Sequence, residues 1–153
     1  MTSLSSPTII FDIDGTLASG DHRIHYIRSK PKNWPAYMKG IPHDVPISEI
    51  VWMLKTLHAA GSTILIATGR GEEVRSTTTE WLDEVAEIKG LYSKLYMRPL
   101  KDNRPDYIVK GEMLDQMWGD GYHPAIVFDD RDSVVKMWRD RGLKCLQVAE
   151  GNF

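Results

Sequence analysis

Five short apolar segments alternate along this sequence with segments of helical spacing, and this alternation restricts the fold more than any other feature. The strand-like segments are residues 9–11, 63–67, 94–97, 125–128 and 144–148. The helical segments are 46–60, 72–88, 106–119 and the residues leading up to Gly142, and Asp106 is expected to cap the third of them. Such alternation requires right-handed crossovers between parallel strands. It therefore predicts an α/β fold, a Rossmann-like three-layer sandwich with a five-stranded, mostly parallel sheet covered on both faces.

Residues 18–46 interrupt the alternation and show no sustained period of either kind. The segment is rich in proline, glycine, cations and aromatics, and only residues 34–38 resemble a short helix. An insertion of this length in a small domain is often a functional lid, although a solvated loop that packs onto the body is an equal alternative. Tyr26 and Trp34 lie among the cations and are the candidates for stacking on a base. The remaining tryptophans are expected to pack in the core or along helices: Trp52, Trp81, Trp118 and Trp138.

The bulk properties limit the class of protein. A chain of 153 residues suffices for one domain with a real core, so we expect a single domain over 1–153 with 18–46 as a lid insertion. The formal net charge of −2 provides no general attraction to nucleic acid. No apolar run approaches a membrane span, and residues 1–7 lack the pattern of a signal peptide, which predicts a cytoplasmic protein without a membrane partner. The single cysteine, Cys145, is expected to be a packed thiol.

Two aspartates stand one residue apart at the end of the first apolar segment, in the sequence Ile-Ile-Phe-Asp-Ile-Asp-Gly-Thr over 9–16. Side chains alternate along a strand, so Asp12 and Asp14 point the same way. Two carboxylates at such a short separation need a cation or a shared proton. Gly15 permits a tight turn, and Thr16 offers a hydroxyl or an N–H to an anion. An ordinary strand-to-loop turn is the alternative interpretation of the same residues.

Further polar residues follow two other strand-like segments. Thr68, Gly69 and Arg70 come after the second segment, and Asp129 and Asp130 come after the fourth. The carboxyl ends of parallel strands meet at one edge of a sheet, where ligands bind in α/β folds. We therefore expect these clusters to converge with Asp12 and Asp14.

The converging residues suit phosphoryl transfer through a covalent intermediate. Such a route requires a carboxylate nucleophile, a second carboxyl group as acid and then base, and a cation that offsets the phosphate charge. Lys110, one turn inside the helix that starts at the same edge, is the candidate cation, with a solvated helix lysine as the alternative. A ligand set of carboxylate oxygens without histidine or cysteine favours Mg²⁺.

In order along the chain, the Asp-x-Asp-Gly-Thr motif, Thr68, Lys110 and the Asp-Asp pair resemble the four motifs of the haloacid dehalogenase superfamily of phosphatases. The resemblance implies that Asp12 is the nucleophile and Asp14 the general acid and base. It also implies that Thr68 binds the phosphoryl oxygens and that Lys110 neutralises charge. The implied magnesium site consists of Asp12, the backbone carbonyl of Asp14, and Asp129, with Asp130 assisting through water or by orienting Lys110.

A closer resemblance lies within that superfamily. The sequences Thr-Gly-Arg at 68–70, Asp-Tyr-Ile-Val-Lys at 106–110, Asp-Asp-Arg at 129–131 and Gln-Val-Ala-Glu-Gly-Asn-Phe at 147–153 are similar to the 3′-phosphatase domain of bacteriophage polynucleotide kinase-phosphatase. This resemblance implies contacts from Arg70 and Arg131 to a phosphorylated nucleotide or nucleic-acid end, although Arg131 alternatively pairs only locally. No phosphate-binding loop of the kinase type occurs, so no kinase domain is expected in this chain.

Three alternatives remain open at the level of sequence. A nucleoside monophosphatase or other small-molecule phosphatase would share the same catalytic residues. A non-catalytic module that binds Mg²⁺ and phosphate, as a receiver does, would carry similar carboxylates. A nucleic-acid binding module without catalysis would have to use the cations of the lid and of residues 98–104. The sequence leaves the oligomeric state open.

Overall fold

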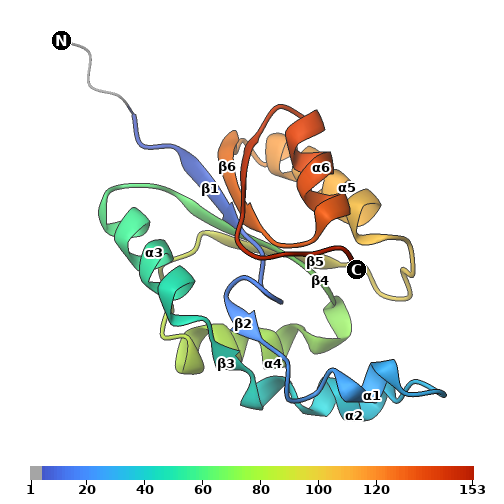
Figure 1. The fold of residues 1–153 in the computed structure, drawn as a ribbon. Helices are drawn as coiled ribbons and strands as arrows, with labels where there is room; N and C mark the ends of the chain where they lie inside the picture. Colours follow the sequence, from blue (N-terminus) through green and yellow to red (C-terminus); the bar gives the residue numbers. More distant parts are fainter. Residues whose placement is uncertain (1–4) are drawn as a thin grey trace.

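The computed structural model describes residues 5–153, so the first four residues of the N-terminal stretch considered above lie outside the described residues. The central sheet of the protein has the strand order β5-β4-β1-β6-β7, and all neighbouring strands run parallel (Figure 1). The strands are β1 Thr8–Phe11, β4 Ile64–Gly71, β5 Lys94–Arg98, β6 Pro124–Asp129 and β7 Lys144–Gln147. The predicted five-stranded parallel α/β fold is confirmed.

Helices cover both faces of this sheet (Figure 1). The major helices are α3 Ser48–Ala59, α4 Arg75–Glu80, α5 Asp106–Gly119 and α6 Asp132–Asp140. One core cluster joins Ile9 and Phe11 of β1 to Leu54 of α3, whereas a second joins Ile10 of β1 to Val109 of α5. Alternate residues of β1 therefore enter opposite cores, as the two-residue period of a strand requires.

The residues between β4 and β5 differ from the continuous helix that the sequence predicts over 72–88. They form a 3-10 turn η2 at Glu72–Val74, then α4, then a π-helical turn η3 at Trp81–Val85. β4 also continues beyond Ala67 to Gly71, because Gly71 pairs with Arg98 of β5 after a register shift.

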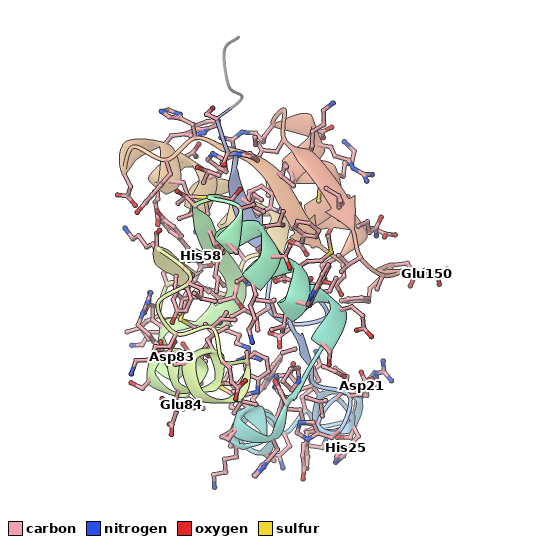
Figure 2. All side chains as sticks on the ribbon, turned by 90° about the vertical axis from the view of Figure 1, so that its left-hand side faces the viewer. Asp21, His25, His58, Asp83, Glu84 and Glu150 are labelled. Atoms are coloured by element: carbon pink, nitrogen blue, oxygen red, sulfur yellow. The ribbon has the colours of Figure 1, made fainter. Side chains whose placement is uncertain are left out.

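The lid segment, residues 18–46, lies beyond the carboxyl edge of the sheet (Figure 1). It contains β2 Ala18–Ser19, α1 His25–Arg28, α2 Trp34–Lys39, the 3-10 turn η1 Ile41–His43 and β3 Val45–Pro46. The short helix expected at 34–38 is confirmed by α2, while α1 and the antiparallel β2–β3 pair were not predicted. In Figure 2, Asp21 and His25 mark this segment, and Glu150 marks the C-terminal segment.

The tryptophans divide into two groups. Trp81 and Trp138 are buried in the core, as expected. Trp52 is 65% exposed, because it lies outside the face of α3 that buries Val51 and Leu54. Trp118 is 41% exposed and lies under the guanidinium of Arg141. The packing expectation is therefore wrong for Trp52 and Trp118.

Cys145 is buried in the second core, and burial raises the pKa of its thiol to about 12. This agrees with the expected packed thiol. Within the described residues, no helix has the length and apolar character that crossing a membrane requires.

Candidate active site

Three carboxylates converge at the carboxyl ends of two neighbouring strands. Asp12 follows β1, Asp129 ends β6, and Asp130 is the next residue. All three are buried, and one carboxylate oxygen from each lies within 4.8 Å of the others. Three negative charges so close together repel one another unless cations or protons compensate them.

Lys110 of α5 supplies one compensating charge. Its buried Nζ donates to Oδ1 of Asp12 at 2.8 Å and to Oδ2 of Asp129 at 2.9 Å. Burial lowers the pKa of Lys110, but the two carboxylates outweigh burial and raise that pKa well above its ordinary value. Lys110 is therefore charged. The structure orients it through Asp12 and Asp129 rather than through Asp130, which differs from one role that the sequence suggested for Asp130.

One lysine does not balance three carboxylates. Burial and the neighbouring Asp129 raise the pKa of Asp12 well above its ordinary value, although Lys110 opposes the shift. Burial and Asp129 also raise the pKa of Asp130. The remaining negative charge and the all-oxygen donor set suit a hard divalent cation, so the residues present fit Mg²⁺.

Gly15 is required by this arrangement. Its φ of +84° lies in the region that glycine adopts without strain, and a Cβ at this position would collide with the Asp130 carboxylate. Next to it, the buried hydroxyl of Thr16 donates to Oδ2 of Asp12 at 3.1 Å. The turn after β1 thus both brings Asp130 close and orients Asp12.

Asp14 occupies a different environment from Asp12. Its side chain is 40% exposed. Nε and Nη2 of Arg70 donate to its two carboxylate oxygens at 3.0 and 2.7 Å, and Nη2 of Arg23 donates at 3.3 Å. Burial favours the neutral acid, but Arg70 and Arg23 outweigh it and hold the pKa of Asp14 below its ordinary value. Asp12 and Asp14 therefore have pKa values shifted in opposite directions.

Asp44 of the lid segment was not identified from the sequence. Its buried carboxylate accepts from Nε and Nη2 of Arg23 at 2.7 and 2.9 Å and from Nη2 of Arg70 at 2.8 Å. It also contacts the ring of His22, and its backbone carbonyl accepts from Nε1 of Trp81 at 2.9 Å. Asp44 lies 30 positions after Asp14 in a segment without periodicity, so no sequence signal indicates this contact.

Thr68 lies buried in β4, the strand that neighbours β1. Its Oγ1 accepts from the backbone N–H of Arg70 at 3.1 Å, which leaves the hydroxyl proton for another acceptor. Gly69 approaches the carboxylate of Asp106, which a Cβ would contact at 2.8 Å. The second polar cluster is thus adjacent to the start of α5.

Asp106 does not cap α5, contrary to the sequence expectation. It is the first residue of the helix, and its carboxylate instead pairs with Arg98 and with Nη1 of Arg131, the latter at 2.9 Å. Nε of Arg98 also donates to the carbonyl of Gly69 at 2.9 Å. Arg131 therefore lies at the rim of the site and is linked through Asp106 and Arg98 to the loop after Thr68.

The two aromatic candidates of the lid are not joined to the carboxylates. Trp34 is 46% exposed and packs edge-on against Tyr37. The Tyr26 ring packs against His25, which Figure 2 places at the lid end of the molecule. Among residues 5–153, no hydrogen bond or ring contact connects Tyr26 or Trp34 to Asp12, Asp129 or Asp130.

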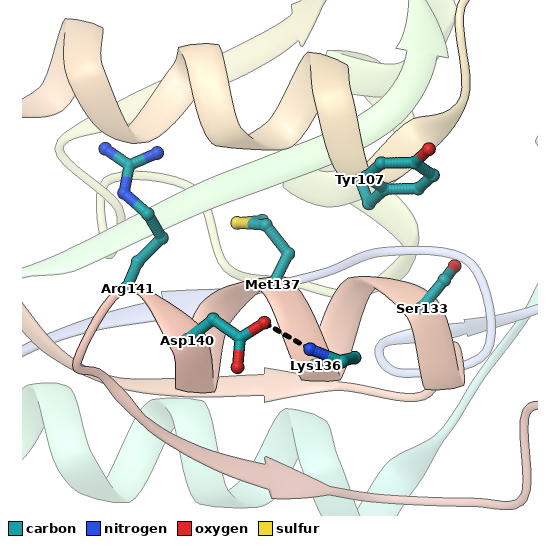
Figure 3. A pocket seen from close by; sticks show the side chains of 6 residues that line it. All are labelled: Tyr107, Ser133, Lys136, Met137, Asp140 and Arg141. Atoms are coloured by element: carbon teal, nitrogen blue, oxygen red, sulfur yellow. Dashed lines mark hydrogen bonds and ion pairs between the residues drawn. The ribbon is translucent and has the colours of Figure 1, made fainter.

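A hollow of about 320 Å³ lies between α5 and α6, away from the predicted residues (Figure 3). Its lining residues are Tyr107, Ser133, Lys136, Met137, Asp140 and Arg141. The close-up shows Lys136 paired with Asp140 and no converging carboxylates. This hollow contains none of the candidate catalytic residues.

Known proteins are similar in sequence to this chain over most of its length. The family described as "Polynucleotide kinase PNKP phosphatase domain" matches residues 6–153. A protein of Autographa californica nuclear polyhedrosis virus, provisionally assigned as a bifunctional polynucleotide kinase/RNA ligase, is 28% identical over 133 residues. The matched region is 86% of this chain and 18% of the viral protein.

Solved structures share the fold. A chain of the Pnkp1/Rnl/Hen1 RNA repair complex is 31% identical with a TM-score of 0.78, and the match covers 96% of this chain and 44% of that one. A haloacid dehalogenase-like hydrolase from Streptococcus pneumoniae is 18% identical with a TM-score of 0.66, and the match covers 92% of this chain and 83% of the hydrolase chain. The present chain thus spans less than half of the repair-complex chain and a smaller share of the viral protein.

Proposed function

This chain belongs to the family of polynucleotide kinase PNKP phosphatase domains and is a phosphatase of the haloacid dehalogenase type, and from that premise we propose that it removes the 3′-phosphate from nucleic-acid ends or nucleotides. The proposed route is Mg²⁺-dependent and passes through an aspartyl-phosphate. The observation that carries this proposal is the difference in environment between Asp12 and Asp14. Asp12 is buried and accepts a hydrogen bond from Lys110, whereas Asp14 is partly exposed and pairs with Arg70. Two carboxyl groups in such different environments suit two different roles.

In the first step, an Asp12 carboxylate oxygen attacks the phosphorus and the bond between phosphorus and the sugar oxygen breaks. Thr16 and Lys110 already bind the two oxygens of Asp12, at 3.1 and 2.8 Å, so its orientation is fixed before the substrate arrives. The leaving oxygen takes a proton from the Asp14 carboxyl group. The substrate phosphate competes for Arg70, which weakens the pairing that keeps Asp14 ionised.

In the second step, water attacks the phosphorus of the acyl phosphate, and the bond between phosphorus and the Asp12 oxygen breaks. Asp14, now a carboxylate, accepts the proton of the attacking water. The pairing with Arg70 and Arg23 favours this ionised form. Phosphate leaves, and Asp12 and Asp14 return to their starting states.

The metal and phosphate ligands follow from the same arrangement. Asp12, Asp129, Asp130 and the backbone carbonyl of Asp14 would hold Mg²⁺, which supplies Lewis acidity and neutralises phosphate charge when it is bound. The hydroxyl of Thr68 would donate to a phosphoryl oxygen, and Gly15, Thr16 and Gly69 would allow close approach of the backbone.

The nucleotide portion of the substrate would contact the residues around the site. Arg131 offers a guanidinium group at the rim, while the buried Arg70 would contact the phosphate itself. Tyr26 and Trp34 of the lid segment offer aromatic rings for stacking.

A substrate panel tests this proposal. Phosphate release should occur with a 3′-phosphorylated oligonucleotide in the presence of Mg²⁺ and stop when the ion is chelated. A 5′-phosphorylated oligonucleotide of the same sequence is the matched control and should be a poor substrate. Asp12→Asn should abolish release, because an amide is not a nucleophile here. Equal hydrolysis of the two oligonucleotides, or turnover by Asp12→Asn, would overturn the proposed function.

A further inference from the structure

The C-terminal segment, residues 148–153, is attached to the loop that carries the metal-site carboxylates. The carbonyl of Gly151 accepts from the backbone N–H of Asp132 at 2.8 Å. Just before the segment, Nε2 of Gln147 donates to the carbonyl of Asp130 at 2.9 Å. A Cβ at Gly151 would collide with that same carbonyl, so only glycine allows the approach. In Figure 1 this segment runs back across the carboxyl side of the sheet.

The attachment places Phe153 at the rim of the active site. Its ring lies over the guanidinium of Arg131, with Cζ of Arg131 4.9 Å from the ring centroid. Arg131 directly follows Asp130 in sequence and is held by Asp106 at 2.9 Å. The ring therefore occupies a fixed position beside the metal-site loop.

Most of this ring is uncovered. Phe153 is 68% exposed, the highest exposure among the large hydrophobic residues that the structure leaves exposed within 5–153. Arg131 contacts the ring, and Phe153 as a whole residue stays largely exposed. An uncovered aromatic ring next to a phosphate site has the features of a base-stacking platform, because every nucleobase offers a π-face and stacking tolerates any sequence.

We propose that Phe153, seated on Arg131, is a specificity-determining residue that stacks on the base of the nucleotide carrying the reacting phosphate. This inference rests on the proposed function and adds the contact that distinguishes a nucleotide from a simple phosphate ester. Arg131 acts as a positioning residue for the ring. Phe153 takes no part in the chemical steps.

The test compares two 3′-phosphorylated oligonucleotides that differ only in the last residue, one with a base and one abasic. Phe153→Ala should lower kcat/KM for the base-containing substrate by about tenfold, in line with the usual energy of base–aromatic stacking. Its kcat/KM for the abasic substrate should stay unchanged. Phe153→Tyr should restore the wild-type preference, because tyrosine keeps the ring.

Trp118→Ala is the matched control. Trp118 is also an exposed aromatic stacked with an arginine at 4.9 Å, but it lies near the opposite end of α5 from Asp106. This variant should leave both substrates unaffected. Melting temperatures of all variants separate unfolding from a loss of stacking.

Two outcomes would overturn the inference. One is an equal loss on both substrates in Phe153→Ala, and the other is an unchanged preference for the base-containing substrate. Failure of the proposed function looks different, because wild-type protein would then release no phosphate from either oligonucleotide.

Discussion

The sheet edge and the lid segment hold their charged groups in different ways. At the sheet edge, Asp12 and Asp129 leave adjacent parallel strands and share Lys110, so the backbone of the sheet fixes their separation. In the lid segment, Arg23 and Asp44 form a buried pair, whereas most of the other cations and Trp34 stay exposed. From this difference we propose that the sheet edge carries out the chemistry and that the lid segment contacts the substrate.

Asp14 is the point where the two regions meet. It accepts from Arg70 of β4 and from Arg23 of the lid segment, and Asp44 binds both guanidinium groups from the other side. A change in either region therefore reaches the proposed general acid and base. The following variants separate the contributions of the two regions.

Apart from replacement of the nucleophile Asp12, loss of the Lys110 charge should produce the largest effect on activity. Lys110→Met leaves the three carboxylates without their buried cation, and kcat should fall by about 10²–10³-fold, as expected for removal of a preorganised electrostatic contact. Steady-state phosphate release measures the effect. Lys94→Met is the control, because Lys94 forms an exposed pair with Asp120 and should retain full activity. A loss of only a few-fold in Lys110→Met would show that the sheet edge does not depend on this contact.

Removal of Asp44 should have the largest effect on stability. Asp44→Ala deprives two buried guanidinium groups of a partner, and the cost of breaking a buried ion pair is about 3–5 kcal/mol. Chemical denaturation gives the free energy of unfolding. Glu72→Ala removes the partner of Arg75 in a half-exposed surface pair, so its cost should be about 0–1 kcal/mol. Similar losses in the two variants would contradict the anchoring role of Asp44.

In the absence of metal, the folded protein should become more stable when Asp130 is replaced by the neutral asparagine. Because burial and Asp129 raise the pKa of Asp130 in the folded protein, its ionisation costs stability as the pH rises from the ordinary carboxyl range through the raised pKa. Without metal, Asp130→Asn should therefore melt at a higher temperature than wild type at neutral pH. The difference should vanish below about pH 3, where aspartate is protonated in both states.

The same variant also tests the metal site without measuring activity. Added Mg²⁺ should raise the melting temperature of the wild type more than that of Asp130→Asn, because one ligand has been lost. An equal increase in both proteins would exclude Asp130 as a ligand.

The aromatic residues of the lid segment should have the smallest effect. Trp34→Ala and Tyr26→Ala should raise KM for a 3′-phosphorylated oligonucleotide by up to about tenfold, with kcat unchanged, because only stacking is lost. A small phosphate ester without a base should show no change in KM. If both substrates were affected alike, the lid would influence the catalytic residues rather than select the substrate.

The sheet and the convergence of its polar residues were predictable because each strand is a local apolar run. Ile9–Phe11 and 125–128 are recognisable without tertiary information, and the carboxylates follow directly after them. Parallel pairing then dictates that Asp12 and Asp129 lie together. This part of the site depends on sequence neighbours and on one rule of topology.

The contacts that were missed join segments that are distant in sequence. The Asp44 contacts to Arg23 and Arg70 and the Asp106 contacts to Arg98 and Arg131 depend on how loops pack, for which the sequence contains no period. Asp106 was expected to cap α5, because an aspartate before a helix commonly does so. Here two arginines compete for its carboxylate, and tertiary pairing determines its role.

Covalent labelling tests the central claim, that Asp12 is the nucleophile. A labelled phosphate ester whose leaving group needs no proton, such as nitrophenyl phosphate, is mixed with Asp14→Asn in the presence of Mg²⁺ and quenched in acid. This variant can then complete the first step without the Asp14 acid but lacks the base for the second step. We predict label on the peptide that contains Asp12 and none on Asp12→Asn. The account would be contradicted if the wild type released phosphate while Asp14→Asn carried no label on Asp12.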